Sequence, residues 1–106
     1  MARRIRATCI QMAHDAGESH LTGALSVVDI LVALYHVPER FRVSVAPSIR
    51  GRLVFSKGHA CHALYATWAA MGLIPVEHLA RYARPESPCP IHPCRHYTQQ
   101  VECSSG

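Results

Sequence analysis

The spacing of apolar residues predicts an amphipathic helix over residues 2–16. Apolar side chains recur there at three- and four-residue intervals, which places them on one face of a helix: Ile5, Cys9, Met12 and Ala16. Arginine and other polar residues occupy the remaining positions. Gly17 is a suitable C-terminal stop, because glycine enters the left-handed region at little cost.

A second helix is predicted over residues 27–35, where apolar residues occur almost all round. Ser26 and Asp29 form a weak capping box at its start, and Pro38 ends it. A helix that is apolar on every side is normally buried against other elements, so we expect burial of this one.

The next stretch predicts a strand, a turn and two further helices. Residues 53–55 form a short apolar run typical of a buried strand. A helix over 59–71 follows, with Gly72 as its stop, and another over 75–83. A second strand fits only at residues 101–104. Since one or two strands cannot build a sheet, we expect an α/β fold that is mostly helical and incomplete as given.

Composition limits the possible functions. Hydrophobic residues make up 49% of the 106 and charged residues 17%, which predicts a packed core. The net charge is +4, but the basic residues are spread from Arg3 to Arg95, so we expect no nucleic-acid surface. No run approaches the roughly 18–20 apolar residues of a membrane span. Five cysteines is an odd count and nothing suggests secretion, so we expect a cytoplasmic location without a disulfide framework.

The turn at residues 56–59, Ser-Lys-Gly-His, is the first candidate for chemistry. A glycine turn between a strand and a helix exposes backbone N–H groups, and the helix dipole adds attraction for anions, phosphate in particular. Lys57 and His59 add donors beside them. The simpler alternative is an ordinary α/β turn with a solvated lysine. His20, in a polar turn, is by itself most simply a surface histidine.

A zinc site is the second candidate. Two cysteines and two histidines could supply tetrahedral ligands, although they match no common spacing: Cys89, His92, Cys94 and His96. We expect His62 to pack or meet solvent rather than join His59, because neighbouring helix residues point to different faces. Cys103 is more simply a small buried hydrophobe than a nucleophile.

Taken in order, four stretches resemble the N-terminal, thiamine-diphosphate-binding part of transketolase, most closely the N-terminal subunit of split transketolases. They cover nearly the whole chain: residues 3–6 with 19–24, 26–35, 52–65, and 90–93 with 101–106. The resemblance implies a thiamine-diphosphate-binding fold with a parallel sheet flanked by helices. It also implies transfer of a two-carbon ketol unit between sugar phosphates or related carbonyl compounds.

The resemblance assigns roles to four residues. His20 would line the pocket and touch cofactor and substrate, and His92 would lie near the hydroxyl and carbonyl oxygens of the substrate. His59 would hydrogen-bond the cofactor's diphosphate, and the backbone of Gly106 would contact its pyrimidine side. The sequence departs from the family mainly at the substrate end, as at Ser19, so the substrate could be a sugar other than a pentose phosphate, or a ketoacid.

The same resemblance implies that residues 1–106 are a partial domain. The family's metal-binding Gly-Asp-Gly with its asparagine, which holds Mg²⁺ or Ca²⁺, lies beyond Gly106. The glutamate that activates the cofactor belongs to a partner, either a second copy or a C-terminal transketolase subunit. We therefore expect the chain alone to be inactive. The alternative is a non-catalytic interaction fragment or remnant, which the apolar helix at 27–35 suggests.

Overall fold

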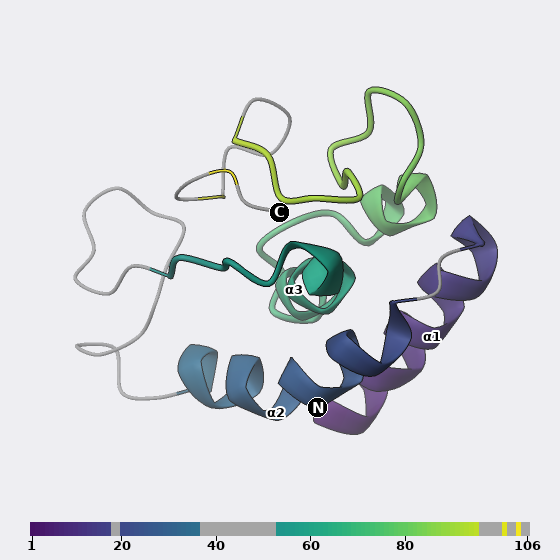
Figure 1. Ribbon diagram of the computed structural model, residues 1–106. Helices are drawn as coiled ribbons and strands as arrows, with labels where there is room; N and C mark the ends of the chain where they lie inside the picture. The colour runs from purple at the N-terminus through teal and green to yellow at the C-terminus, as the bar shows by residue number, and fades with distance from the viewer. Residues whose placement is uncertain (18–19, 37–52, 96–100, 102–103, 105–106) are drawn as a thin grey trace.

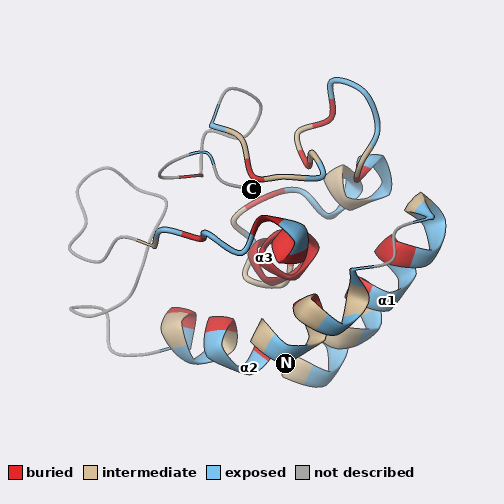
Figure 2. Ribbon diagram, in the orientation of Figure 1, coloured by how far each residue is buried: buried red, intermediate tan, exposed pale blue. Residues whose placement is uncertain are grey.

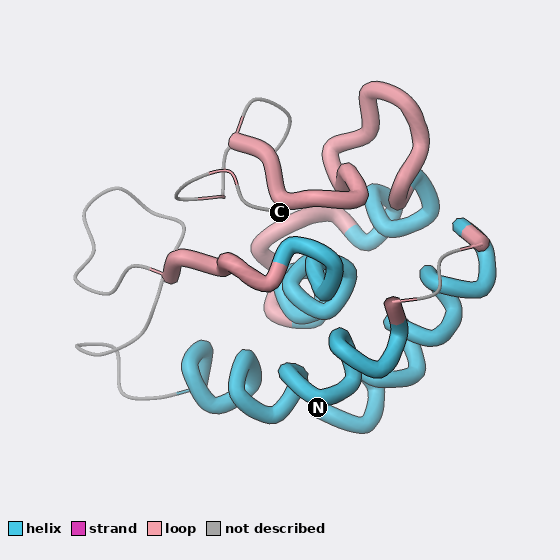
Figure 3. Tube along the Cα trace, in the orientation of Figure 1, coloured by secondary structure: helices cyan, strands magenta, loops and turns pink. Residues whose placement is uncertain are grey.

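The computed structural model describes residues 1–17, 20–36, 53–95, 101 and 104. Its helices are α1 (Ala2–Ala16), α2 (Leu21–His36) and α3 (Cys61–Ala70), with the short 3₁₀ helices η2 (Gly58–Ala60) and η3 (Val76–Arg81). Figure 1 shows α3 between α1 and α2 on one side and the chain after η3 on the other. The described part of the chain is mostly helical, as expected, and contains no strand (Figure 3).

The core is built around α3. Its residues are buried from Cys61 to Ala69, and helices α1 and α2 each turn one apolar face toward it (Figure 2). The second helix, which we expected to be buried against other elements, packs against them by one face only. Helix α2 buries Ala24, Val28, Leu31 and Tyr35, whereas Ile30 on its outer side remains 59% exposed.

Helix α1 confirms its prediction at both ends. Gly17 adopts a left-handed conformation with φ of 67°, and its N–H donates to the carbonyls of Ala13 and His14. The start of α2 was predicted too late. The helix already begins at Leu21, so Ser26 lies within it and donates to the carbonyl of Gly23 at 2.8 Å instead of capping.

The predicted strand at residues 53–55 is wrong, because residues 53–57 form a loop. A strand is stabilised by a hydrogen-bonded neighbour, and the described segments supply none. Within the apolar run Phe55 is buried and Leu53 packs partly against the core, whereas Val54 is 62% exposed. Of the second predicted strand, Val101 and Ser104 are not in a strand and the two residues between them lie outside the described residues.

The predicted third helix is divided into η2 and α3. Gly72, with φ of 73°, ends α3 in a Schellman motif. The N–H of Leu73 donates to the carbonyl of Trp68 at 2.8 Å, and the N–H of Gly72 donates to the carbonyl of Ala69 at 3.1 Å. The fourth predicted helix forms as the 3₁₀ helix η3 after Pro75. No helix in the described part of the chain combines the length and hydropathy needed to span a membrane.

Two side-chain contacts hold α2 in place. The indole Nε1–H of Trp68 donates to the hydroxyl of Tyr35 at 2.6 Å, which joins α3 to α2 inside the core. At the surface, Arg6 of α1 pairs with Asp29 of α2 at 2.6 Å. Asp29, predicted as part of a cap, is instead an interhelical partner. These contacts join the end of α2 to α3 and the middle of α2 to α1.

Candidate functional site

Three histidines that are far apart in the sequence meet at the start of α2 and α3. His20 immediately precedes α2, His59 lies in η2, and His92 lies in the proline-rich segment after η3. The ring centroids of His20 and His59 are 4.3 Å apart, and those of His59 and His92 are 4.6 Å apart. The structure thus brings together three of the four residues that the resemblance singled out. Gly106, the fourth, lies outside the described residues.

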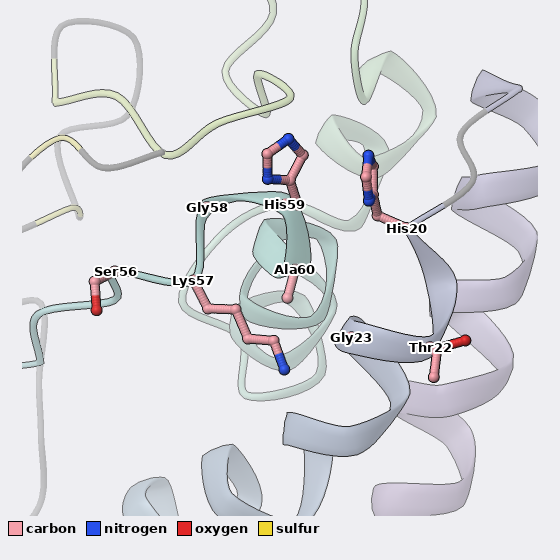
Figure 4. Close-up of a pocket in the computed structure, with 8 residues that line it drawn as sticks. All are labelled: His20, Thr22, Gly23, Ser56, Lys57, Gly58, His59 and Ala60. Atoms are coloured by element: carbon pink, nitrogen blue, oxygen red, sulfur yellow. The ribbon is translucent and has the colours of Figure 1, made fainter.

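A pocket of about 540 Å³ opens beside His20 and His59. It lies between the first turn of α2 and the η2 turn, and its lining residues are His20, Thr22, Gly23, Ser56, Lys57, Gly58, His59 and Ala60 (Figure 4). The rings of His20 and His59 lie on one side of the pocket, while the side chain of Lys57 extends toward α2. The volume is sufficient for a small ligand.

Lys57 is held against α2 by two small residues. Its ammonium donates to the hydroxyl of Ser26 at 3.2 Å, and Ser26 in turn donates to the carbonyl of Gly23. Gly23 lies directly beneath the lysine, since a Cβ at this position would make van der Waals contact with Lys57 Cε at 3.4 Å. Sequence reasoning missed this role of Ser26 and Gly23, although their one-turn spacing on a helix was the available signal.

The side chains around the pocket favour an anion. Lys57 and the two histidines provide hydrogen-bond donors, and the lining contains no carboxylate. The backbone N–H groups that we expected to be free for an anion are already hydrogen-bonded at three positions of the turn. Within the turn, Gly58 donates to Ser56 and Ala60 to Lys57, each at 3.0 Å, and Cys61 donates to Gly58. The 3₁₀ turn consumes these donors, so attraction for an anion comes from the side chains and the helix dipoles.

His92 carries a buried polar atom that the described residues leave unsatisfied. Its Nδ1 has no hydrogen-bond partner among them, and a buried ring nitrogen without one is costly. Because His92 stands 4.6 Å from His59 by ring centroid, a ligand reaching that space would find both rings.

The zinc alternative finds no support in the part of its site that the structure describes. No group of three potential metal ligands occurs among the described residues, and His96 lies outside them. Cys89 is 1% exposed, and burial raises the pKa of its thiol to about 12. His62 is fully buried with its Nδ1 3.3 Å from the Tyr82 hydroxyl, and so packs apart from His59. Cys103 lies outside the described residues.

The helical scaffold thus carries a pocket whose lining side chains suit an anion, with His20 and His59 in the lining and His92 beside His59. Comparison with known proteins identifies the family to which the chain belongs. Residues 1–106 match the transketolase, thiamine diphosphate binding domain, so the chain belongs to that family and its resemblance to transketolase is confirmed.

Individual relatives agree. The chain is 34% identical to a 6-deoxy-6-sulfo-D-fructose transketolase subunit of Clostridium sp. strain MSTE9, over 99% of this chain and 38% of that protein. It is 33% identical to an apulose-4-phosphate transketolase subunit of Actinobacillus succinogenes, over 99% of this chain and 39% of that protein. Identity to mouse transketolase is 33%, over 87% of this chain and 15% of that enzyme. The chain thus spans well under half the length of these relatives.

Proposed function

We propose that these residues are the first part of the thiamine-diphosphate-binding domain of a transketolase-type enzyme. The enzyme would transfer a two-carbon ketol unit between sugar phosphates or related carbonyl compounds. The observation that carries this proposal is the convergence of three histidines. His20 and His59 line a pocket whose side chains favour an anion, and the ring of His92 contacts that of His59.

In this proposal His59 and Lys57 hold the diphosphate. The fit is chemical, since the lining offers donors and no carboxylate, and a diphosphate needs donors on every side. When bound, thiamine diphosphate supplies the electron sink for breaking and making carbon–carbon bonds. The described residues offer no ligand set for Mg²⁺ or Ca²⁺. In this proposal the metal would be held by the family's Gly-Asp-Gly segment with its asparagine, as the resemblance to transketolase implies.

His20 and His92 would serve the substrate. Imidazole exchanges protons readily near neutral pH, which suits a residue that moves protons to and from sugar hydroxyl and carbonyl oxygens. The unsatisfied Nδ1 of His92 would find its partner in such an oxygen. Gly106 would contact the pyrimidine side of the cofactor through its backbone, as the resemblance implies.

The substrate would be a sugar or ketoacid, and the active form would contain a second chain. Two relatives are named as transketolase subunits, one for a sulfonated and one for a phosphorylated sugar, which supports both points. The partner would be a second copy or a C-terminal transketolase subunit in the cytoplasm, and the 106 residues alone would be inactive.

A chimaera tests the proposal. Residues 1–106 would replace the matching segment of the Clostridium subunit, which would be assayed with its partner subunit. Replacing His59 with Ala should weaken thiamine diphosphate binding roughly 10-fold or more, the value of a hydrogen bond to a charged group. Replacing His92 with Ala should lower kcat by about 10² or more with cofactor affinity unchanged. His14→Ala, on the exposed face of α1, is the matched control. Unchanged cofactor affinity in His59→Ala would show that this assignment is wrong.

The second candidate function is a non-catalytic interaction fragment. The exposure of Ile30 on α2 favours it, because an apolar side chain on an apolar helix is suited to a partner surface. Size-exclusion chromatography and circular dichroism of the 106-residue chain decide this point. A monodisperse monomer with a cooperative thermal transition would count against an obligatory partner.

A further inference from the structure

The segment that carries His92 is fastened to α3 by two side chains. The thiol of Cys61 donates to the carbonyl of Ile91 at 2.8 Å, with a second, longer approach to that of Pro90 at 3.5 Å. The hydroxyl of Tyr65 donates to the carbonyl of Pro90 at 2.9 Å. The two acceptors are the carbonyls immediately before His92, and the two donors stand one helical turn apart on the same face of α3.

We propose that Cys61 and Tyr65 are positioning residues that hold His92 beside His59. This inference rests on the proposed function in one respect only, the use of His92 by the enzyme. Both donors lie on the helix that follows the turn carrying His59, so α3 sets the position of one histidine directly and of the other through these two bonds.

The local sequence explains why side chains are needed. Pro90 and Pro93 have no N–H, so this segment cannot enter a helix or a central strand and its carbonyls need other donors. Upstream, the segment is already tied, since the N–H of Ala83 donates to the carbonyl of Cys89 at 3.0 Å and the N–H of Cys89 donates to the Ser87 hydroxyl at 3.0 Å. Cys61 and Tyr65 extend this attachment to the residues that adjoin His92.

Burial keeps both groups in the donating form. Each side chain is 0% exposed. Burial raises the pKa of the Cys61 thiol to about 12 and also raises that of the Tyr65 hydroxyl. A thiol and a phenol that stay protonated remain donors over the whole working range of pH. An aliphatic side chain in either place would fill the space but would not direct a carbonyl.

Backbone hydrogen exchange on the 106-residue chain tests the attachment. The amides of Ala83 and Cys89 report opening of the segment, and that of Leu73, at the end of α3, reports opening elsewhere. The variants are Cys61→Ala, Tyr65→Phe and the double change. Each lost bond should speed exchange at Ala83 and Cys89 by about fivefold relative to Leu73, and the double variant by about 25-fold.

A proton–proton contact measured by nuclear magnetic resonance tests the position of His92 itself. The cross-peak between the rings of His59 and His92 should weaken in the double variant, whereas that between His20 and His59 should persist. Cys61→Ser retains a hydrogen-bond donor. It should therefore keep the exchange rates at Ala83 and Cys89 and the His59–His92 cross-peak at their values in the parent protein. His14→Ala, on the exposed face of α1 and away from both this segment and Leu73, should leave the ratio of exchange rates unchanged.

The inference is overturned if exchange at Ala83 and Cys89 rises no more than at Leu73, or if the His59–His92 cross-peak keeps its intensity. If the double variant does not fold, Tyr65→Phe alone gives the same decision at the fivefold level. Both measurements need no cofactor, so they succeed or fail independently of ketol transfer. In the chimaera, Tyr65→Phe should lower kcat and leave the affinity for thiamine diphosphate unchanged.

Discussion

The hydrogen bond between Trp68 and Tyr35 gives the sharpest test of the packing between α2 and α3. The two atoms are 2.6 Å apart, and the side chains are 2% and 4% exposed. Replacing Tyr35 with Phe keeps the ring and its packing but removes the oxygen that accepts the indole N–H. Water cannot readily replace it at that burial. An unsatisfied buried donor costs about 1–3 kcal/mol, so the free energy of unfolding should fall by that amount.

The protein contains its own probe for this measurement. Trp68 is the only tryptophan in the chain, and it is buried, so its fluorescence reports global unfolding. In urea, a slope of about 1–3 kcal/mol per molar predicts that the midpoint falls by roughly 1 M while the slope stays constant.

Replacing Tyr65 with Phe is the matched control. It removes a hydroxyl whose partner, the carbonyl of Pro90, is also approached by the Cys61 thiol. The loss should therefore be nearer the net value of one hydrogen bond, about 0.5–1.5 kcal/mol. A Tyr35→Phe variant whose stability stays within about 0.3 kcal/mol of the parent would refute the reasoning, because the indole N–H would then have found another acceptor.

Three further predictions concern pH and the glycine beside Lys57. Burial raises to about 12 the pKa of three thiols whose ordinary value is 9.0: Cys9, Cys61 and Cys89. These thiols lose their protons at a lower pH in the unfolded chain than in the folded chain, so thermal melts should show stability falling as pH rises above 9.0. A stability that does not change with pH in this range would contradict the burial of the thiols. Arg6 lowers the pKa of Asp29, so this exposed ion pair makes a small contribution to stability that is lost as pH falls through the folded-state pKa of Asp29. Asp29→Asn should remove this part of the acid dependence of stability. Gly23→Ala should raise stability by about 0.5–1 kcal/mol because glycine weakens a helix interior. By contrast, Gly23→Leu should displace Lys57 and weaken calorimetric binding of inorganic pyrophosphate; equal binding in both variants would contradict the role of Lys57.

The helices were predictable where the pattern is local. Helix α1 has a polar face, an apolar face and a glycine at its end, and its limits agree with the prediction. Helix α2 began earlier than predicted because residues 21–23 were assigned to the preceding turn. Thr22 and Gly23 belong to the helix and line the pocket, which propensity does not reveal. The sequence also could not show that α3, rather than α2, lies at the centre, since both helices are apolar and only tertiary packing decides which is enclosed.

The strand at residues 53–55 failed for a different reason. A short apolar run fits a strand, a loop or a helix equally well until a neighbour is present to share hydrogen bonds. Among the described residues no neighbour is present, and the run is held instead by the burial of Phe55. Periodicity alone could not have separated these outcomes.

The candidate site was predictable in unequal parts. His59 and Lys57 follow from the local turn at residues 56–59, although the free amides expected there are used within the turn. His20 and His92 followed only from the resemblance to transketolase. No local pattern marks His20, and the only local pattern around His92 suggested zinc, because each histidine meets His59 through the packing of segments distant in sequence. The link from Cys61 and Tyr65 to the segment before His92 could not be read from the sequence for the same reason.

The position of the pocket explains how it could attract an anion after its backbone donors have been used. Thr22 and Gly23 lie in the first turn of α2, and His59 and Ala60 directly precede α3, so two helix N-termini flank one cavity. A helix carries about half a positive charge at that end, and two such ends reinforce each other. The ammonium of Lys57 adds to this field while Ser26 restrains its position. Removing Lys57 alone should therefore weaken pyrophosphate binding without abolishing it, because the field of the two helices remains.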